Sequence, residues 1–153
     1  MSGKNSLLEF LRQQKAEQEA EGKIDWNVRR REWLDAIDSL FKAVEDWLRG
    51  AVSQHLLRID RTVTNISEEH IGTYEVPVLR ITAPRGRHVD VIPRARNVFG
   101  GSGRVDLESG PKSITLIRTA KKTWAFTVRH ANSLQKVELT EESLAEFLRD
   151  LLG

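Results

Sequence analysis

The sequence contains no cysteine, and this absence removes several kinds of chemistry at once. Disulfide bonds, thiolate catalysis and zinc or iron–sulfur sites with cysteine ligands are all excluded. Other catalytic motifs are missing too: the chain has no phosphate-binding loop ending in Gly-Lys-Ser/Thr, no Gly-x-Ser-x-Gly motif and no His-Glu-x-x-His motif. The sequence therefore predicts no cofactor and favours binding over catalysis.

Long hydrophobic runs are also lacking. The N-terminal segment offers only a short apolar cluster, formed by Leu7, Leu8, Phe10 and Leu11, before a polar stretch begins. A signal peptide or a membrane-spanning helix needs a longer apolar segment, so we expect a soluble, cytoplasmic protein. Apolar residues make up 39% of the 153 residues, which suits one domain with a real core and an appended arm.

Charge is distributed unevenly along the chain. The segment 76–130 carries eleven basic and three acidic residues, a net charge of +8, whereas the segments 1–75 and 131–153 each carry a net charge of −3. A basic segment between acidic ones favours an anionic partner. Arginine binds phosphate through a planar fork of donors. Six arginines are therefore candidates for anion or nucleic-acid binding: Arg80, Arg85, Arg87, Arg94, Arg96 and Arg104.

Two observations weigh against nucleic acid as the partner. The arginines could equally be solvated, or paired with acidic residues of the flanking segments. The basic segment is also poor in aromatic residues, which would stack on exposed bases, because it has only Phe99, Trp124 and Phe126. Trp124, Phe126 and Val128 alternate along one predicted strand and therefore belong to a core face. Any nucleic-acid binding should thus use the phosphate backbone and be tolerant of sequence.

A metal site is a weaker hypothesis. His88 and Asp90 lie two residues apart, as do Asp106 and Glu108, so each pair shares one face of a strand. If the sheet brought these four side chains together, they could hold a divalent metal for chemistry on a phosphorylated substrate. Ion pairs with neighbouring arginines explain the same acids without a metal, and we expect none.

Two helices are predicted before the basic segment. The first occupies an arm, residues 1–22, which is apolar only in its first turns. The second runs over residues 25–50, with Asp25 as its N-cap and Gly50 near its end.

The second helix carries a broad apolar stripe. Trp26, Trp33, Leu40 and Trp47 are spaced by seven residues within it. So wide a stripe is typical of a helix that packs on a sheet, although a dimer seam and a ligand surface also fit.

The rest of the chain predicts a sheet followed by one helix. Alternation and β-branched residues indicate strands within residues 56–139, separated by turn-like segments at 83–86, 100–103, 109–112 and 120–122. These connections are too short for crossover helices, which predicts an antiparallel meander of five to seven strands. A last helix covers residues 140–152. We therefore expect an α+β domain over residues 23–153, with helices packed on one face of the sheet.

The function expected from these features is that of a non-catalytic interaction module. Three tryptophans on one helix, beside an arm with a small apolar end, offer more apolar surface than one sheet face is expected to cover. We expect a homodimer or a subunit of a larger assembly, joined through Trp26, Trp33, Leu40, Trp47 and the arm. Sequence-tolerant nucleic-acid binding is the alternative, and a metal-dependent enzyme is a minor one.

Overall fold

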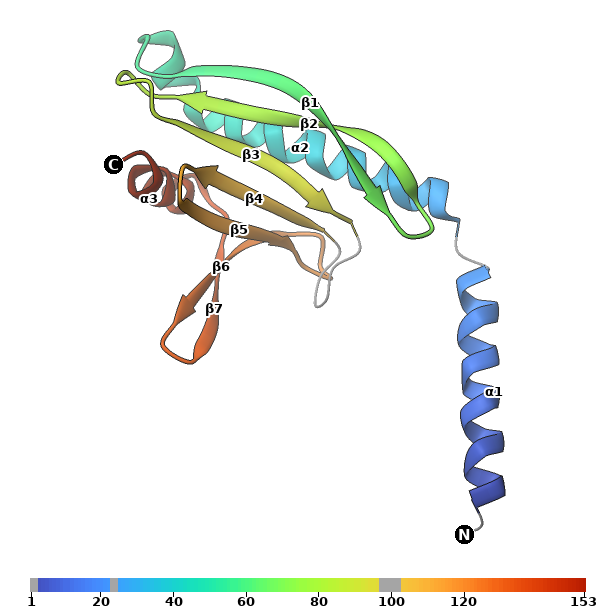
Figure 1. The fold of residues 1–153 in the computed structure, drawn as a ribbon. Helices are drawn as coiled ribbons and strands as arrows, with labels where there is room; N and C mark the ends of the chain where they lie inside the picture. Colours follow the sequence, from blue (N-terminus) through green and yellow to red (C-terminus); the bar gives the residue numbers. More distant parts are fainter. Residues whose placement is uncertain (1–2, 23–24, 97–102) are drawn as a thin grey trace.

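The computed structural model describes residues 3–22, 25–96 and 103–153. Over these residues the chain forms three helices and seven strands, in an α+β arrangement with two helices before the sheet and one after it (Figure 1). The elements are α1 Gly3–Gly22, α2 Trp26–Ser53, β1 Arg58–Glu68, β2 Gly72–Thr82, β3 His88–Ala95, β4 Arg104–Ser109, β5 Lys112–Arg118, β6 Trp124–His130, β7 Ser133–Glu138 and α3 Glu141–Leu152.

The seven strands form one sheet in which each strand pairs with the next in the sequence, and every pair is antiparallel. This confirms the predicted meander. The connections are short because the turn residues accept unusual backbone angles: Gly86 and Gly110 have φ angles of 85° and 58°, a region that glycine enters without steric cost. Phe99 and the predicted turn residues 100–102 lie outside the described residues.

Helix α2 begins as the sequence predicts. The side chain of Asp25 accepts hydrogen bonds from the backbone N–H groups of Asn27 and Val28, at 3.1 and 3.2 Å, and so satisfies two donors that the first helical turn leaves open. The helix continues to Ser53, three residues beyond Gly50, and places one apolar face against the sheet.

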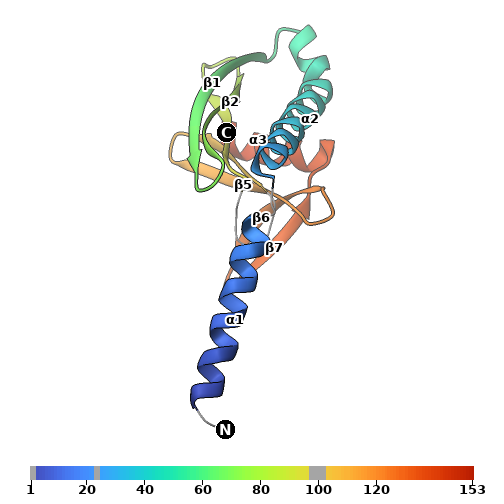
Figure 2. The ribbon, with the colours of Figure 1, turned by 90° about the vertical axis from the view of Figure 1, so that its right-hand side faces the viewer.

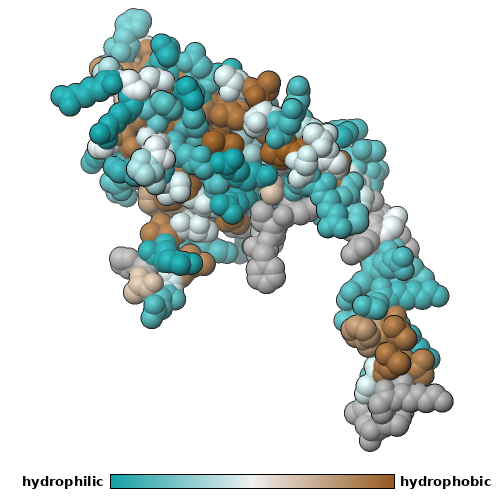
Figure 3. All heavy atoms as spheres, in the orientation of Figure 1, coloured by the Kyte–Doolittle hydropathy of each residue, from teal (hydrophilic) through white to brown (hydrophobic). Residues whose placement is uncertain are grey.

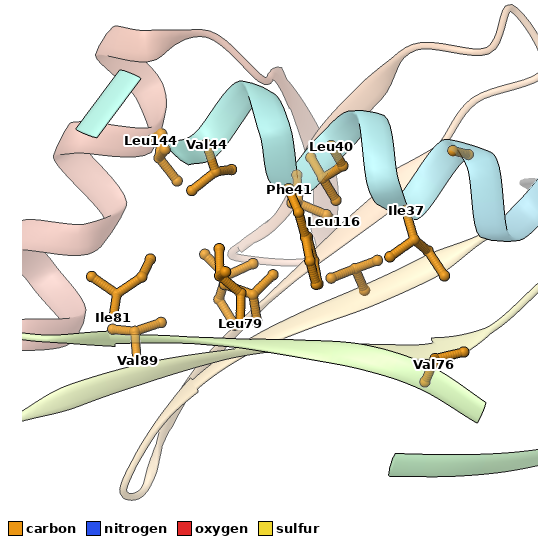
Figure 4. Close-up of a cluster of buried hydrophobic side chains, with 14 of the residues drawn as sticks. Ile37, Leu40, Phe41, Val44, Val76, Leu79, Ile81, Val89, Leu116 and Leu144 are labelled. Carbon is orange, nitrogen blue, oxygen red and sulfur yellow. The ribbon is translucent and has the colours of Figure 1, made fainter. Parts of the chain in front are cut away.

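The core lies between the sheet and the helices α2 and α3, which cover the same face (Figures 1 and 4). In β3 the buried Val89 and Val91 alternate with outward-facing residues, whereas β2 changes phase at Pro77 and Val78, so that Val76 and Leu79 are both buried. Figure 4 shows α2 contributing Ile37, Leu40, Phe41 and Val44 opposite residues of three strands and α3, namely Val76, Leu79, Ile81, Val89, Leu116 and Leu144.

The predicted core face of β6 is confirmed for Trp124 and Phe126, while Val128 is partly buried. Phe126 is fully buried, and its ring centroid lies 4.3 Å from that of Phe147 in α3. The ring of Trp124 lies 6.1 Å from that of Trp33 in α2. These contacts join the last strands to both covering helices.

Helix α3 is fastened to the sheet through its first turn. Thr140 and Ser143 form a capping box in which each side chain accepts a hydrogen bond from the other residue's backbone N–H. The hydroxyl of Ser143 also donates to the backbone oxygen of Glu138 at the end of β7, at 2.8 Å. The cap thereby sets where the apolar face of α3 meets the core.

Helix α1 extends away from the rest of the molecule as an arm (Figures 1 and 2). Its side chains are exposed from Asn5 to Ala20, so the arm covers no part of its own chain there. Among the described residues, no helix combines the length and the apolar character that a membrane crossing requires.

Candidate interaction surface

The four residues expected to mediate interaction have different environments. Trp33 and Leu40 are 1% and 2% exposed and belong to the core between α2 and the sheet. Almost none of either side chain is therefore exposed, although Leu40 still borders the groove described below. Trp26 is partly exposed, and its ring stacks on that of His70 with centroids 5.0 Å apart. Trp47 is also partly exposed and lies at the edge of a groove.

This groove, which we call the α2 groove, runs along the flank of α2 and has a volume of about 520 Å³. Residues of α2 spaced by four form one wall. The other wall comes from the end of β5, the β5–β6 turn, the start of β6 and the link between β7 and α3. Its lining consists of Asp35, Ala36, Ser39, Leu40, Ala43, Trp47, Arg118, Lys122, Thr123, Trp124, Glu138 and Leu139.

Apolar side chains and charged groups both line the α2 groove. The apolar lining comes from Ala36, Leu40, Ala43, Trp47, Trp124 and Leu139. Arg118 and Lys122 supply positive charge, and Asp35 and Glu138 supply negative charge. An apolar lining with a few polar groups of both signs suits a folded segment of protein.

The guanidinium of Arg118 is incompletely satisfied. Its Nε atom is buried and has no acceptor among the described residues. A buried donor without an acceptor costs about 1–3 kcal/mol, so a carboxylate brought to this side chain would be stabilising. Lys122 is exposed in the adjoining turn, where it has a positive φ of 64°.

The arm carries the complementary feature. Leu7, Leu8, Phe10 and Leu11, which we call the arm tip, are 55%, 45%, 56% and 48% exposed. Figure 3 shows hydrophobic atoms gathered near this end of α1, with hydrophilic atoms along the rest of the helix. A helical segment with so much exposed apolar surface is a candidate for contact with another molecule.

Three of the six candidate arginines form ion pairs on the sheet face that the helices leave uncovered. Arg80 binds both carboxylate oxygens of Asp90, at 2.8 and 3.1 Å. Arg94 binds Asp106 at 3.1 Å and Glu108 at 2.5 Å, and Arg104 also binds Asp106. Their charge is therefore largely compensated by acids of the same segment.

The other three arginines lie at the two ends of β3. Arg87 donates to the backbone oxygen of Gly153 at the end of α3, where a cation is favoured by the helix dipole. Arg85 is exposed in the same turn. Arg96, beyond the far end of β3, is partly buried, and burial together with the nearby charges of Arg29 and Arg118 lowers its pKa. The six arginines therefore do not form one cluster: three lie on the uncovered sheet face, two in the turn before β3 and one beyond the end of β3.

The metal candidates share the uncovered sheet face. Asp90 lies opposite Glu108 in the register, and Asp106 lies opposite Ile92. His88 Nε2 is 3.8 Å from an oxygen of Asp90. The carboxylates of Asp90, Asp106 and Glu108 all form ion pairs with arginines. Within the described residues, no three histidine, aspartate or glutamate side chains lie close enough together to hold a metal ion.

The α2 groove is not predicted by the sequence. Arg118, Lys122, Glu138 and Leu139 carry no motif and come from separate elements. One signal was present in the sequence, since Asp35, Ser39, Ala43 and Trp47 follow a spacing of four on one helix face.

No family model, curated protein or solved structure matches this chain.

Proposed function

We propose that this protein is a non-catalytic interaction module that associates with other protein chains through the arm tip of α1. The observation that carries the proposal is the exposure of Leu7, Leu8, Phe10 and Leu11, each 45–56% open to solvent on a helix whose side chains are exposed from Asn5 to Ala20. Full burial of one such side chain contributes about 1.5–3 kcal/mol, so the four together could supply much of a binding energy.

The rest of the molecule supports this role. The domain has a complete core without α1, since the core consists of residues from α2, the strands and α3. An arm that the core does not need is free to serve a contact. Helices commonly bind by inserting an apolar face into a groove of a partner.

Photo-crosslinking in the cells that make the protein tests the proposal whichever protein the partner is. A photoreactive phenylalanine analogue replaces Phe10 in the full chain, and adducts are identified by mass spectrometry. We expect a discrete adduct to another protein chain, because the tip becomes buried on association. The same analogue at Gln14, one helical turn further along α1 and outside the apolar tip, is the matched control. The absence of any adduct specific to position 10 would refute the proposal.

A further inference from the structure

We infer that the partner of the arm tip is a second copy of this chain, and that the tip docks in the α2 groove of that copy. This inference rests on the proposed function and adds the identity of the partner and the place of contact. Each chain carries one arm tip and one α2 groove. Two chains can therefore exchange arms in a closed, symmetric dimer in which each contact occurs twice.

The chemistry of the two surfaces is complementary. Glu9 lies within the apolar tip, and Arg12 follows one turn later. Neither side chain has an ion-pair partner among the described residues. The α2 groove offers Arg118 and Lys122 to an acid, and Asp35 and Glu138 to a base. A docked tip would place apolar side chains on Ala36, Ala43 and Trp47 while its two charges meet opposite ones.

The unsatisfied Arg118 supports the same contact. Its Nε atom is buried beside the groove without an acceptor, and such a donor favours a ligand that brings a carboxylate. Glu9 is the acid that the arm tip itself carries, flanked by the apolar side chains of Leu8 and Phe10. An apolar tip without an acid would leave this donor unpaired.

The arm of the same chain does not fill the groove in this structure. Figures 1 and 2 show α1 running away from the sheet and α2, with its N-terminal end farthest from them. The tip lies at that far end, and its side chains are open to solvent. The groove is therefore open to the tip of a second copy.

Sedimentation velocity of the full chain over a wide concentration range tests the inference. We expect a monomer–dimer equilibrium. Glu9→Lys and Lys122→Glu should each weaken dimerisation about tenfold, because each places like charges together. The double variant should regain part of the affinity, since the pair between positions 9 and 122 is restored with exchanged charges while Arg118 still faces the lysine introduced at position 9.

The matched controls are charge reversals of the same kind, Glu to Lys and Lys to Glu, at positions outside the contact between the arm tip and the α2 groove. Glu17→Lys lies on α1 beyond the tip, and Lys136→Glu lies on β7 outside the groove lining; neither should alter the dimer. Thermal unfolding followed by circular dichroism verifies that each variant folds.

Three results would overturn the inference: a chain that stays monomeric, a dimer indifferent to both reversals, or a monomer whose Phe10 analogue crosslinks to its own groove. A Phe10 adduct to a different protein would overturn it while leaving the proposed function intact.

Discussion

Gly103 lies against the buried ring of Trp33, where no side chain fits. A Cβ atom at position 103 would lie 2.3 Å from Cζ3 of the ring, far inside van der Waals contact. The ring cannot move aside easily, because Trp33 is 1% exposed and surrounded by the core. The backbone oxygen of Gly103 also accepts a hydrogen bond from the Arg118 N–H at 2.9 Å, which holds the strand in place.

Gly103→Ala should therefore lower the free energy of unfolding by about 1–3 kcal/mol, the usual cost of overpacking a core. Urea denaturation, monitored by tryptophan fluorescence, measures this change in the free energy of unfolding. Gly50→Ala is the matched control, because a Cβ at position 50 meets nothing within 4 Å and alanine suits a helix. That control should be neutral or stabilising by up to about 1 kcal/mol. Equal effects of the two substitutions would contradict this account of Gly103.

The strands β3, β4 and β5 are joined on their uncovered face by one carboxylate. Asp106 of β4 is 6% exposed and accepts hydrogen bonds from Arg94 of β3, Arg104 of β4 and Thr115 of β5. Burial acts to raise the pKa of Asp106, but the hydrogen bonds from Arg104, Thr115 and Arg94 and the positive charge of Arg104 outweigh it and hold the pKa below its ordinary value. The ionised form therefore stabilises the folded sheet.

Asp106→Asn should destabilise the protein by about 1.5–3 kcal/mol near neutral pH, the range for hydrogen bonds to charged groups. Because the folded-state pKa is depressed, this contribution is present above the unfolded-state pKa and is lost as the pH falls through the folded-state value. The difference in the free energy of unfolding between wild type and variant, measured by urea denaturation, should thus shrink as the pH falls below the ordinary carboxyl range.

Asp60→Asn on the same face is the control for Asp106→Asn. Asp60 is 51% exposed in its pair with Arg58, so its substitution should change stability by less than about 1 kcal/mol. A difference between wild type and Asp106→Asn that stays constant with pH would contradict the assignment.

Across the whole molecule, the basic side chains of the segment 76–130 lie at separate places, and several of them are paired with acceptors of the same chain. Arg80, Arg94 and Arg104 are bound by carboxylates, while Arg87 and Lys112 bind backbone oxygens at the end of α3. Nucleic-acid binding depends on unpaired cations that replace the counterions of phosphates. The structure therefore offers fewer free cations than the sequence count suggests.

Fluorescence anisotropy with labelled single-stranded DNA, double-stranded DNA and RNA should show only weak binding, at low as well as near-physiological salt, because too few unpaired arginines lie together. Binding that is tight at low salt, falls steeply with salt and disappears in Arg85→Glu would contradict this expectation and favour a phosphate-binding surface. Lys136→Glu, on the exposed β7 strand, would control for the change in net charge.

The order of elements could be predicted from the sequence because it depends on local rules. A period of about 3.6 residues marks α2 and α3, Asp25 and Thr140 mark where they begin, and alternation with short turns marks a meander. The arm could be predicted in the same way, since α1 is apolar only at Leu7, Leu8, Phe10 and Leu11.

The tertiary structure alone decided which of these residues meet. Trp33 and Trp47 occupy equivalent places in the seven-residue spacing, yet Trp33 is fully buried and Trp47 only partly, because β6 and the chain around Gly103 lie against Trp33. Likewise, Asp106 binds Arg94 because the pairing of β3 with β4 brings that arginine close, in addition to Arg104 two residues away on its own strand. Periodicity determines which face of an element is apolar, whereas burial and charge pairing depend on neighbours that are distant in the sequence.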